Sequence, residues 1–284
     1  MSRSGAGGIG CALMSRCGGD DFGFYVEKSS LAPNLYPGLV VIDGADDSVH
    51  KKLLKGLRSL LYPPHCGSCG CSLDEHDPEQ TLCEPCLAKI SLPPGEICKV
   101  CSHPMMGLLL CPNCDGRFWQ LTVIVAGCRY EGLARELIQR FKYGRDQSLM
   151  RPLGDLMMPA LRDPRLAGKE FDAIVPVPLH PAREREREFN QATLLSLRLA
   201  RHLDLPVKHL IKRNRVTMPQ AGFDRTRRLL NLEGAFDLTG RVEGGIRVLL
   251  VDDVTTTGTT LDSCASVLMQ AGADEVCAVT VARG

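Results

Sequence analysis

Residues 248–260, which read VLLVDDVTTTGTT, decide the fold of this chain. Four apolar residues, Val248 to Val251, come first, and a continuous apolar run is typical of a buried parallel strand. Two acids follow, then a short loop rich in threonine, and an amphipathic pattern begins at Leu261. This pattern predicts a strand, an acidic pair, a tight loop and a helix in that order. The loop therefore leads directly into the N-terminus of the helix. Free N–H groups and the helix dipole favour an anion at such an end.

The loop has the chemistry of a phosphate site. Gly258 tolerates positive φ, and the neighbouring threonine hydroxyls can donate hydrogen bonds. Asp252 and Asp253 lie one step before the loop, where they can accept hydrogen bonds from sugar hydroxyls or face Mg²⁺, which prefers oxygen ligands. The ligand that suits this arrangement is a ribose 5-phosphate. A P-loop is excluded because no Gly-Lys-Ser/Thr follows. The alternative is an ordinary strand–loop–helix turn in which an aspartate serves as a cap.

This stretch resembles the phosphoribosyl-pyrophosphate (PRPP) motif of type I phosphoribosyltransferases, in which four apolar residues, two acids and one apolar residue precede a Thr/Gly loop. The resemblance implies a PRPP ligand bound with Mg²⁺. It makes Asp252 and Asp253 the candidate catalytic residues. The candidate PRPP-binding residues of this segment are Val254, Thr255, Thr256, Thr257, Gly258, Thr259 and Thr260.

The cysteines point to a second kind of site. Eight of the fourteen form four C-x-x-C pairs, and two such pairs complete a tetrahedral zinc site. The spacing therefore predicts two Cys₄ zinc ribbons with structural Zn²⁺. Sequential pairing closes the shorter loops and is preferred, with a crossed arrangement as the alternative. Cys71, His65, His76 and His103 remain outside the pattern as substitute ligands or plain surface residues. The predicted ligands are Cys66, Cys69, Cys83, Cys86, Cys98, Cys101, Cys111 and Cys114.

The formal charge of +1 gives no global argument for nucleic-acid binding. Residues 181–231, however, hold twelve Lys/Arg against five acids, which suits a phosphorylated ligand or a nucleic-acid backbone. The alternative for each of these residues is a solvated helix face. No apolar run approaches the ~20 residues that cross a bilayer, and the N-terminus lacks the layout of a secretory signal. We therefore expect a cytoplasmic protein without a membrane span.

Hydrophobic periodicity predicts strands alternating with helices, which is typical of a parallel sheet covered on both faces. We expect strands at 121–128, 173–178, 207–211, 247–251 and 275–282, and helices at 131–143, 148–161, 189–203 and 259–271. A further helix is expected from Val49 to Leu61, and a mobile loop at 213–231. Three parts are expected: a poorly ordered extension (1–47), a helix plus double zinc ribbon (48–118), and a phosphoribosyltransferase-like domain (119–284).

The whole pattern resembles the ComF family, a double-zinc-ribbon, phosphoribosyltransferase-like group linked to DNA uptake in competent bacteria. One departure stands out: the family usually has Arg-Gly-Phe-Asn-Gln, whereas Glu188 replaces the glycine in this chain. Besides the cysteine pairs, the matching segments are Tyr130, Phe141–Gly144, Pro176–Pro178, Phe189–Ala192, Gln220, Arg228–Asn231 and Asp252–Thr260.

The family resemblance implies an α/β fold, a type I phosphoribosyltransferase-like parallel sheet preceded by the Cys₄ double zinc ribbon. It implies binding of PRPP with Mg²⁺ and pentosyl transfer to an unknown acceptor. Pro176, Val177 and Pro178 would line the pyrophosphate, and Arg228, with Arg225 and Arg227, would close over it. Asn190 is better explained as a helix cap.

The alternative function is a non-catalytic PRPP- or nucleic-acid-binding accessory protein of natural transformation. Its partners would be single-stranded DNA or competence proteins. Stacking platforms for such DNA are scarce, because Trp119 is the single tryptophan. A PRPP-sensing regulator ranks third.

Overall fold

The computed structural model describes residues 63–74, 77, 79–214 and 234–284, all within one compact unit, Lys51–Gly284. The expected helix that starts at Val49 lies outside the described residues, and so does the expected loop apart from residues 213 and 214. None of the helices within the described ranges is long and apolar enough to cross a membrane. The predicted site residue Arg228, its neighbours Arg225 and Arg227, and His76 also fall outside the described part.

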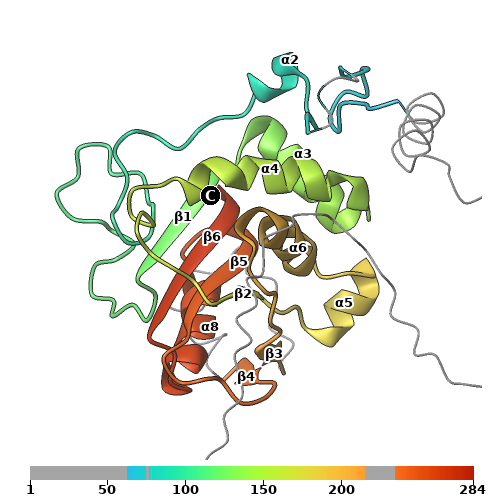
Figure 1. The fold of residues 1–284 in the computed structure, drawn as a ribbon. Coiled ribbons are helices and arrows are strands. Elements are labelled where there is room, and N and C mark those ends of the chain that lie inside the picture. Colours follow the sequence, from blue (N-terminus) through green and yellow to red (C-terminus); the bar gives the residue numbers. More distant parts are fainter. Residues whose placement is uncertain (1–62, 75–76, 78, 215–233) are drawn as a thin grey trace, which may run out of the picture. The chain divides into compact units, whose positions relative to one another are not determined.

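The centre of the molecule is a four-stranded parallel sheet with the order β1-β6-β5-β2 (Figure 1). Four of the five expected strands form this sheet, and most of their apolar residues are buried, as continuous apolar runs require. The strands are β1 (Val123–Arg129), β2 (Ala173–Pro176), β5 (Arg247–Thr255) and β6 (Glu275–Arg283).

Helices cover both faces of this sheet, as expected. Among the described residues, one core joins Leu249 and Val251 of β5 to three helices, and a second core joins Val248 and Leu250 chiefly to a fourth helix. The three helices are α3 (Gly132–Tyr143), α4 (Met150–Leu161), which follows a 3₁₀ turn at Gln147–Leu149, and α6 (Gln191–Leu203). The fourth helix, on the other face, is α8 (Thr259–Gln270), which packs beside the antiparallel pair β3 (Ile211–Arg213) and β4 (Phe236–Leu238).

The expected strand at 207–211 was placed too early. Only Val207 bridges the sheet, opposite Ile174, and the regular pairing belongs to β3 and β4. The helix α5 (Pro181–Arg187) was not expected, because its alternating charges bury no residue and leave no apolar period to detect. It begins at a proline, and the His180 side chain accepts a hydrogen bond from the amide of Ala182.

The two cysteine clusters lie on opposite faces of the sheet. Cys66 belongs to the core with α3, α4 and α6, and so does Cys86, which lies in the short helix α2 (Glu84–Leu87). Cys101 and Cys111 belong to the core with α8. Residues 91–104, which we call the strap, pass from one face to the other across the edge of β1.

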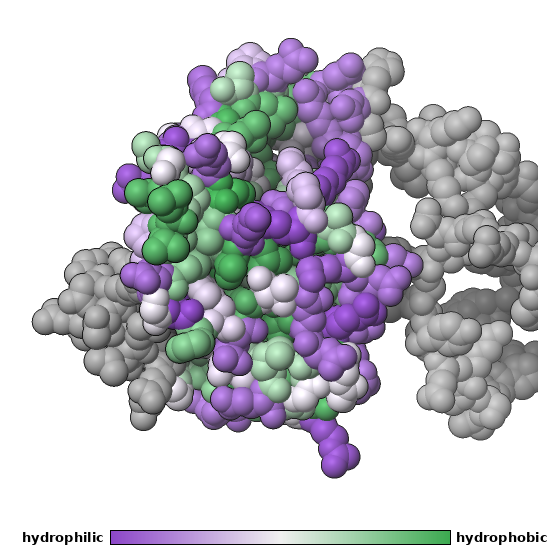
Figure 2. Space-filling view, turned by 90° about the vertical axis from the view of Figure 1, so that its left-hand side faces the viewer, coloured by the Kyte–Doolittle hydropathy of each residue, from purple (hydrophilic) through white to green (hydrophobic). Residues whose placement is uncertain are grey.

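Two hydrogen bonds attach the strap to the edge strand: the Arg129 amide donates to the Ser91 carbonyl at 2.8 Å, and the Ile124 amide to the Val100 carbonyl at 2.7 Å. The strap thereby covers a sheet edge that would otherwise be open to pairing. Figure 2 looks at this side and shows hydrophobic residues gathered on it. The exposed large apolar residues of the strap and the second ribbon are Leu92, Met106, Leu108, Leu109, Leu110 and Phe118.

Candidate functional site

Two groups of four thiols are positioned to bind metal. Within each group the four Sγ atoms lie within 4.8 Å of one another, and the grouping follows the expected sequential pairing. Cys71, His65 and His103 belong to neither group. The groups are Cys66, Cys69, Cys83 and Cys86, and Cys98, Cys101, Cys111 and Cys114.

The spacing of the sulfurs fits zinc. Sulfurs bound at ~2.3 Å to the centre of a tetrahedron lie about 3.8 Å apart. The Sγ atoms are 3.7 Å apart for Cys69 and Cys83, 3.6 Å for Cys98 and Cys114, and 3.7 Å for Cys101 and Cys111. Four thiolates in closed tetrahedra are typical of structural rather than catalytic zinc. Bound zinc would tie these loops together and add folding energy that their small cores lack.

The acidic pair lies within β5, which continues to Thr255, four residues beyond the expected end of this strand. β2 stops where Pro176 pairs with Val251, whereas β6 accompanies β5 as far as the pair Thr255 and Arg283. Pairing with β6 keeps the backbone extended through the acids, which explains the difference from the expectation. Beyond Val251, no strand of the described residues pairs with β5 on its β2 side, and a cavity opens there at the carboxyl edge of the sheet.

Successive residues of a strand point to opposite faces, so the two carboxylates have different surroundings. Asp253 is buried on the face of α3, and its Oδ1 lies 2.8 Å from Nζ of Lys142. The pKa of Lys142 is raised, because the opposite charge of Asp253 outweighs the burial that disfavours the ammonium. Asp252 faces the α8 side. Burial and the neighbouring Asp253 raise the pKa of Asp252 to about 7, although Lys142 acts in the opposite direction.

The loop beyond β5 is short, consisting of Thr256 to Gly258 before α8 begins. Gly258 is the N-cap residue and has φ +73°, so a left-handed conformation is required there. The hydroxyls of Thr257 and Thr259 are hydrogen-bonded to each other at 2.8 Å, and Thr255 is buried. A cavity of about 40 Å³ is lined by the acidic residue Asp252 and by Val254, Thr255, Thr256, Thr257, Gly258, Thr259, Thr260 and Leu261.

A second cavity, of about 410 Å³, adjoins the first and shares Asp252, Val254 and Thr260 with it. Val177 and Pro178, two of the residues assigned to the pyrophosphate in the sequence analysis, line it, whereas Pro176 ends β2 behind them. Its basic lining residues are Lys142, Arg183, Arg187 and Arg213.

These four basic residues were not among the predicted site residues. Lys142 lies in the Phe141–Gly144 segment that matches the ComF pattern, and the three arginines lie in the basic stretch of the sequence, so a signal was present. Arg213 is 8% exposed, and burial together with the nearby Arg183 lowers its pKa.

Asn190 is the N-cap of α6, as expected: its side chain accepts from the Ala192 amide at 3.0 Å and donates to the Val177 carbonyl at 3.0 Å. Glu188, which replaces the usual family glycine, ends α5 with φ +70° and forms an ion pair with Arg145. Such a left-handed backbone suits the glycine that the ComF resemblance implies at this position.

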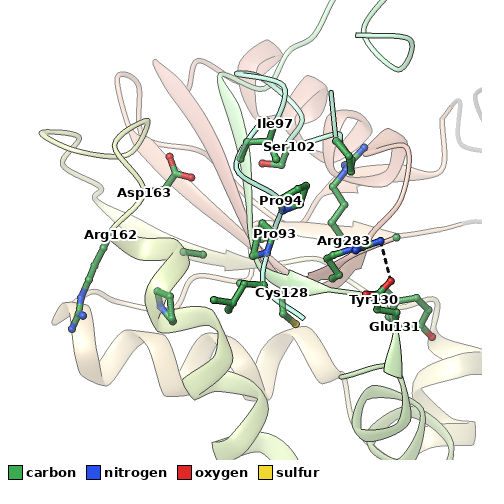
Figure 3. Close-up of a pocket in the computed structure, with 18 of the residues that line it drawn as sticks. Pro93, Pro94, Ile97, Ser102, Cys128, Tyr130, Glu131, Arg162, Asp163 and Arg283 are labelled. Atoms are coloured by element: carbon green, nitrogen blue, oxygen red, sulfur yellow. Dashed lines mark ion pairs between the residues drawn. The ribbon is translucent and has the colours of Figure 1, made fainter. Parts of the chain in front are cut away.

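A larger cavity of about 590 Å³ lies between the strap and β1 (Figure 3) and shares no residue with the two cavities described above. Pro93, Pro94 and Ile97 form one wall. Arg283 lines it, but its Nε and Nη1 are closed to solvent and have no partner among the described residues. Its Nη2 instead lies 3.9 Å from Sγ of Cys101. The other charged residues that line this larger cavity are Arg129, Glu131, Arg162 and Asp163, and the acidic pair and the threonine-rich turn are not part of it.

Comparison with known proteins agrees with this arrangement. The double zinc ribbon domain family model matches residues 57–115. Competence protein F of Haemophilus influenzae is 36% identical over 215 residues, which cover 68% of this chain and 93% of that protein. Competence protein ComFC of Bacillus subtilis is 30% identical over 204 residues, 69% of this chain and 80% of that protein. DNA utilization protein YhgH of Escherichia coli is 33% identical over 215 residues, 69% and 93% respectively.

Among solved structures, an adenine phosphoribosyltransferase is 18% identical with a TM-score of 0.32, and covers 49% of this chain and 74% of its own. A purine phosphoribosyltransferase from Pyrococcus horikoshii is 20% identical with a TM-score of 0.29, and covers 48% and 83%. Similarity at this distance carries no argument about the ligand. The sequence relatives are decisive, because Competence protein F is matched over nearly its whole length. This chain belongs to the ComF family.

Proposed function

We propose that the two adjoining cavities at the carboxyl end of β5 together bind PRPP with Mg²⁺. We further propose that the protein transfers the phosphoribosyl group to an acceptor during the uptake or use of DNA. The role in DNA handling rests on the relatives, which are named competence proteins and DNA utilization proteins. The assignment of PRPP as the ligand rests on the residues that line the two cavities.

The observation that carries the proposal is the order of groups along the site. The amide-rich turn and the N-terminus of α8 form an anion cradle at one end. Asp252 and Asp253 follow at the wall of the larger cavity, and Arg183, Arg187 and Arg213 line that cavity with them. PRPP has the same order of groups: a 5-phosphate, a ribose with two hydroxyls, and a pyrophosphate.

Each group has a task in a transfer at the anomeric carbon. The turn holds the 5-phosphate and fixes the sugar, which contributes by positioning. The carboxylates accept hydrogen bonds from the ribose hydroxyls, and they are also the oxygen ligands that Mg²⁺ prefers. Bound Mg²⁺ would neutralise charge on the pyrophosphate. The arginines stabilise the negative charge that grows on the departing pyrophosphate as the bond to the anomeric carbon breaks.

Isothermal titration calorimetry with PRPP and Mg²⁺ tests the binding step. Asp253→Asn should weaken binding at least about 10-fold, because a charged hydrogen-bond acceptor contributes roughly 1.5–3 kcal/mol. The matched control is Asp274→Asn, an exposed aspartate at the opposite, amino-terminal end of β6, which should bind as the wild type does. Zinc-loaded wild-type protein that gives no heat with PRPP overturns the proposal.

Release of pyrophosphate from PRPP in the presence of a panel of nucleophiles tests the transfer step. Turnover that Asp253→Asn abolishes supports an enzyme. Binding without turnover defeats the transferase and leaves the non-catalytic PRPP-binding accessory protein. Complementation of a Haemophilus influenzae strain that lacks Competence protein F tests the DNA role. The wild-type gene of the protein described here should restore transformation, and its Asp253→Asn variant should not.

A further inference from the structure

The turn that we assign to the 5-phosphate is gripped from behind by the second zinc ribbon. The carbonyl oxygen of Thr257 accepts two hydrogen bonds, from Nδ2 of Asn113 at 3.2 Å and from Nη1 of Arg117 at 2.8 Å. Asn113 is buried and lies inside the knuckle, between the cluster cysteines Cys111 and Cys114. A metal ion held by these cysteines would therefore fix the position of one donor directly.

The other donor is held on several sides. The guanidinium of Arg117 stacks on the ring of Trp119 at 3.6 Å, and its Nη2 lies 3.2 Å from Oδ2 of Asp262 in α8. The other carboxylate oxygen of Asp262 accepts from the backbone amides of Gln120 at 2.8 Å and Leu121 at 3.3 Å. The Arg117 side chain is only 6% exposed, so water competes little for these bonds.

The turn also packs closely against Trp119, which follows the ribbon, and against Ile124 of β1. A Cβ atom added to Gly258 would lie 2.9 Å from Cη2 of Trp119 and 2.7 Å from Cδ1 of Ile124, distances that real Cβ atoms essentially never show. This glycine is thus required by the close approach of Trp119 and Ile124 as well as by its positive φ.

The hydrogen bonds to the Thr257 carbonyl determine which way the following N–H group, that of Gly258, points. In a planar trans peptide the C=O and the following N–H point in opposite directions. Because the Thr257 carbonyl is turned toward the ribbon, the N–H of Gly258 is turned the other way, toward the cradle. Throughout the described residues no acceptor pairs with this N–H, so it is available to an anion.

We propose that the second zinc cluster positions the phosphate turn, with Asn113 and Arg117 as the positioning residues. They hold the Thr257–Gly258 peptide in its anion-binding orientation. Loss of metal from this cluster therefore releases the peptide and lowers the affinity for the ligand. The ligand part of this inference rests on the proposed function. The link between ribbon and turn does not.

The link is tested without ligand, by hydrogen–deuterium exchange of the turn amides in protein with two zinc ions per chain. Asn113→Ala should accelerate exchange across residues 254–261, because one of the two bonds that orient the turn is lost. The matched control is Arg165→Gln. Arg165 donates to the Cys98 carbonyl at 2.9 Å and so braces the same cluster from another side, without touching the turn. Unchanged exchange in Asn113→Ala overturns the link.

The effect on the ligand is measured by calorimetry with PRPP and Mg²⁺. We expect Asn113→Ala to bind about 5-fold more weakly and Arg117→Gln at least about 10-fold more weakly, in line with one neutral and one charged hydrogen bond. Arg165→Gln should stay within about 2-fold of the wild type. Because both donors act on one carbonyl, the double variant should lose less than the product of the two single losses.

The outcomes separate the two ideas. Wild-type protein without any heat from PRPP overturns the proposed function, and the exchange experiment still decides the link. Wild-type binding together with unchanged affinity in Asn113→Ala and Arg117→Gln, at full zinc content, overturns the positioning role and leaves the proposed function standing.

Discussion

The two zinc clusters share one chemistry but have different neighbours. The first lies against the helical face, where the knuckle residue Gly67 meets Pro152 of α4, and where Thr81 donates to Asp155 of the same helix at 2.8 Å. The second lies against the phosphate turn, through Asn113 and Arg117. In our proposal, the same Cys₄ unit serves as a scaffold on one face of the sheet and as a support for the ligand site on the other.

Removing one cluster at a time should separate these roles most strongly. Cys86→Ser and Cys111→Ser should each lower the zinc content from two ions to one. Each should also cost several kcal/mol of stability, because metal binding is folding energy in such small units. Only Cys111→Ser should also weaken PRPP binding, by about 10-fold or more. Metal analysis, thermal unfolding and calorimetry check this, and equal losses of affinity in both variants would contradict the comparison.

A pair of glycine substitutions sharpens the contrast without changing a cysteine of either cluster. In Gly67→Ala the new Cβ would lie 2.8 Å from Cγ of Pro152, a side chain that has to shift, so we expect a cost of about 1–2 kcal/mol. In Gly258→Ala the new Cβ meets Trp119 and Ile124 and the backbone has φ +73°, so about 2–4 kcal/mol is expected.

Urea unfolding gives both costs, and calorimetry gives the affinities. Gly67→Ala should bind PRPP normally, whereas Gly258→Ala should bind it at least about 10-fold more weakly. Normal binding by Gly258→Ala would argue that the turn has no part in holding the phosphate.

Much of this comparison was visible in the sequence. The C-x-x-C spacing predicted both clusters and their sequential pairing, because two knuckles close a tetrahedron over a short loop. The apolar runs predicted the parallel sheet, and Asn190 was expected as a helix cap. Such features depend on neighbours within a few residues, which is the range over which sequence patterns are informative.

The rest depends on contacts between distant segments. The length of β5 follows from its pairing with β6, and nothing around Val254 announces it. The grip of Asn113 on Thr257 joins residues 144 positions apart. Arg213 reaches the site from β3, a strand whose place was missed because its three residues show no pattern long enough to detect. Sequence patterns therefore gave the parts of the site but not how they are joined.

A prediction about Asp252 tests whether this carboxylate destabilises the folded protein. Because the pKa of Asp252 is raised to about 7, the folded state keeps a proton that the unfolded chain loses near pH 4. Stability should therefore fall as the pH rises from about 4 to about 7, and the loss is complete above that range.

Asp252→Asn removes this titration. At pH 8 it should stabilise the protein by about 1–2 kcal/mol, and this gain in stability should shrink toward pH 5. The same substitution should lower the affinity for PRPP. Unfolding midpoints measured across this range check the sign. A variant that is less stable than the wild type at pH 8 would show that the carboxylate is held by favourable partners rather than strained.

The smallest effect is expected at Glu188, which touches neither cluster. Its φ of +70° costs a side-chain-bearing residue about 1 kcal/mol, whereas its ion pair with Arg145 is exposed and contributes about 0–1 kcal/mol. Glu188→Gly relieves the backbone and loses the pair, so its stability should lie between that of the wild type and about 1 kcal/mol above it. Glu188→Ala loses the pair but keeps the Cβ atom, and should be the less stable variant by about 1 kcal/mol. Equal stability of the two variants would show that the left-handed backbone is not strained here, and that the departure from the family glycine is free of cost.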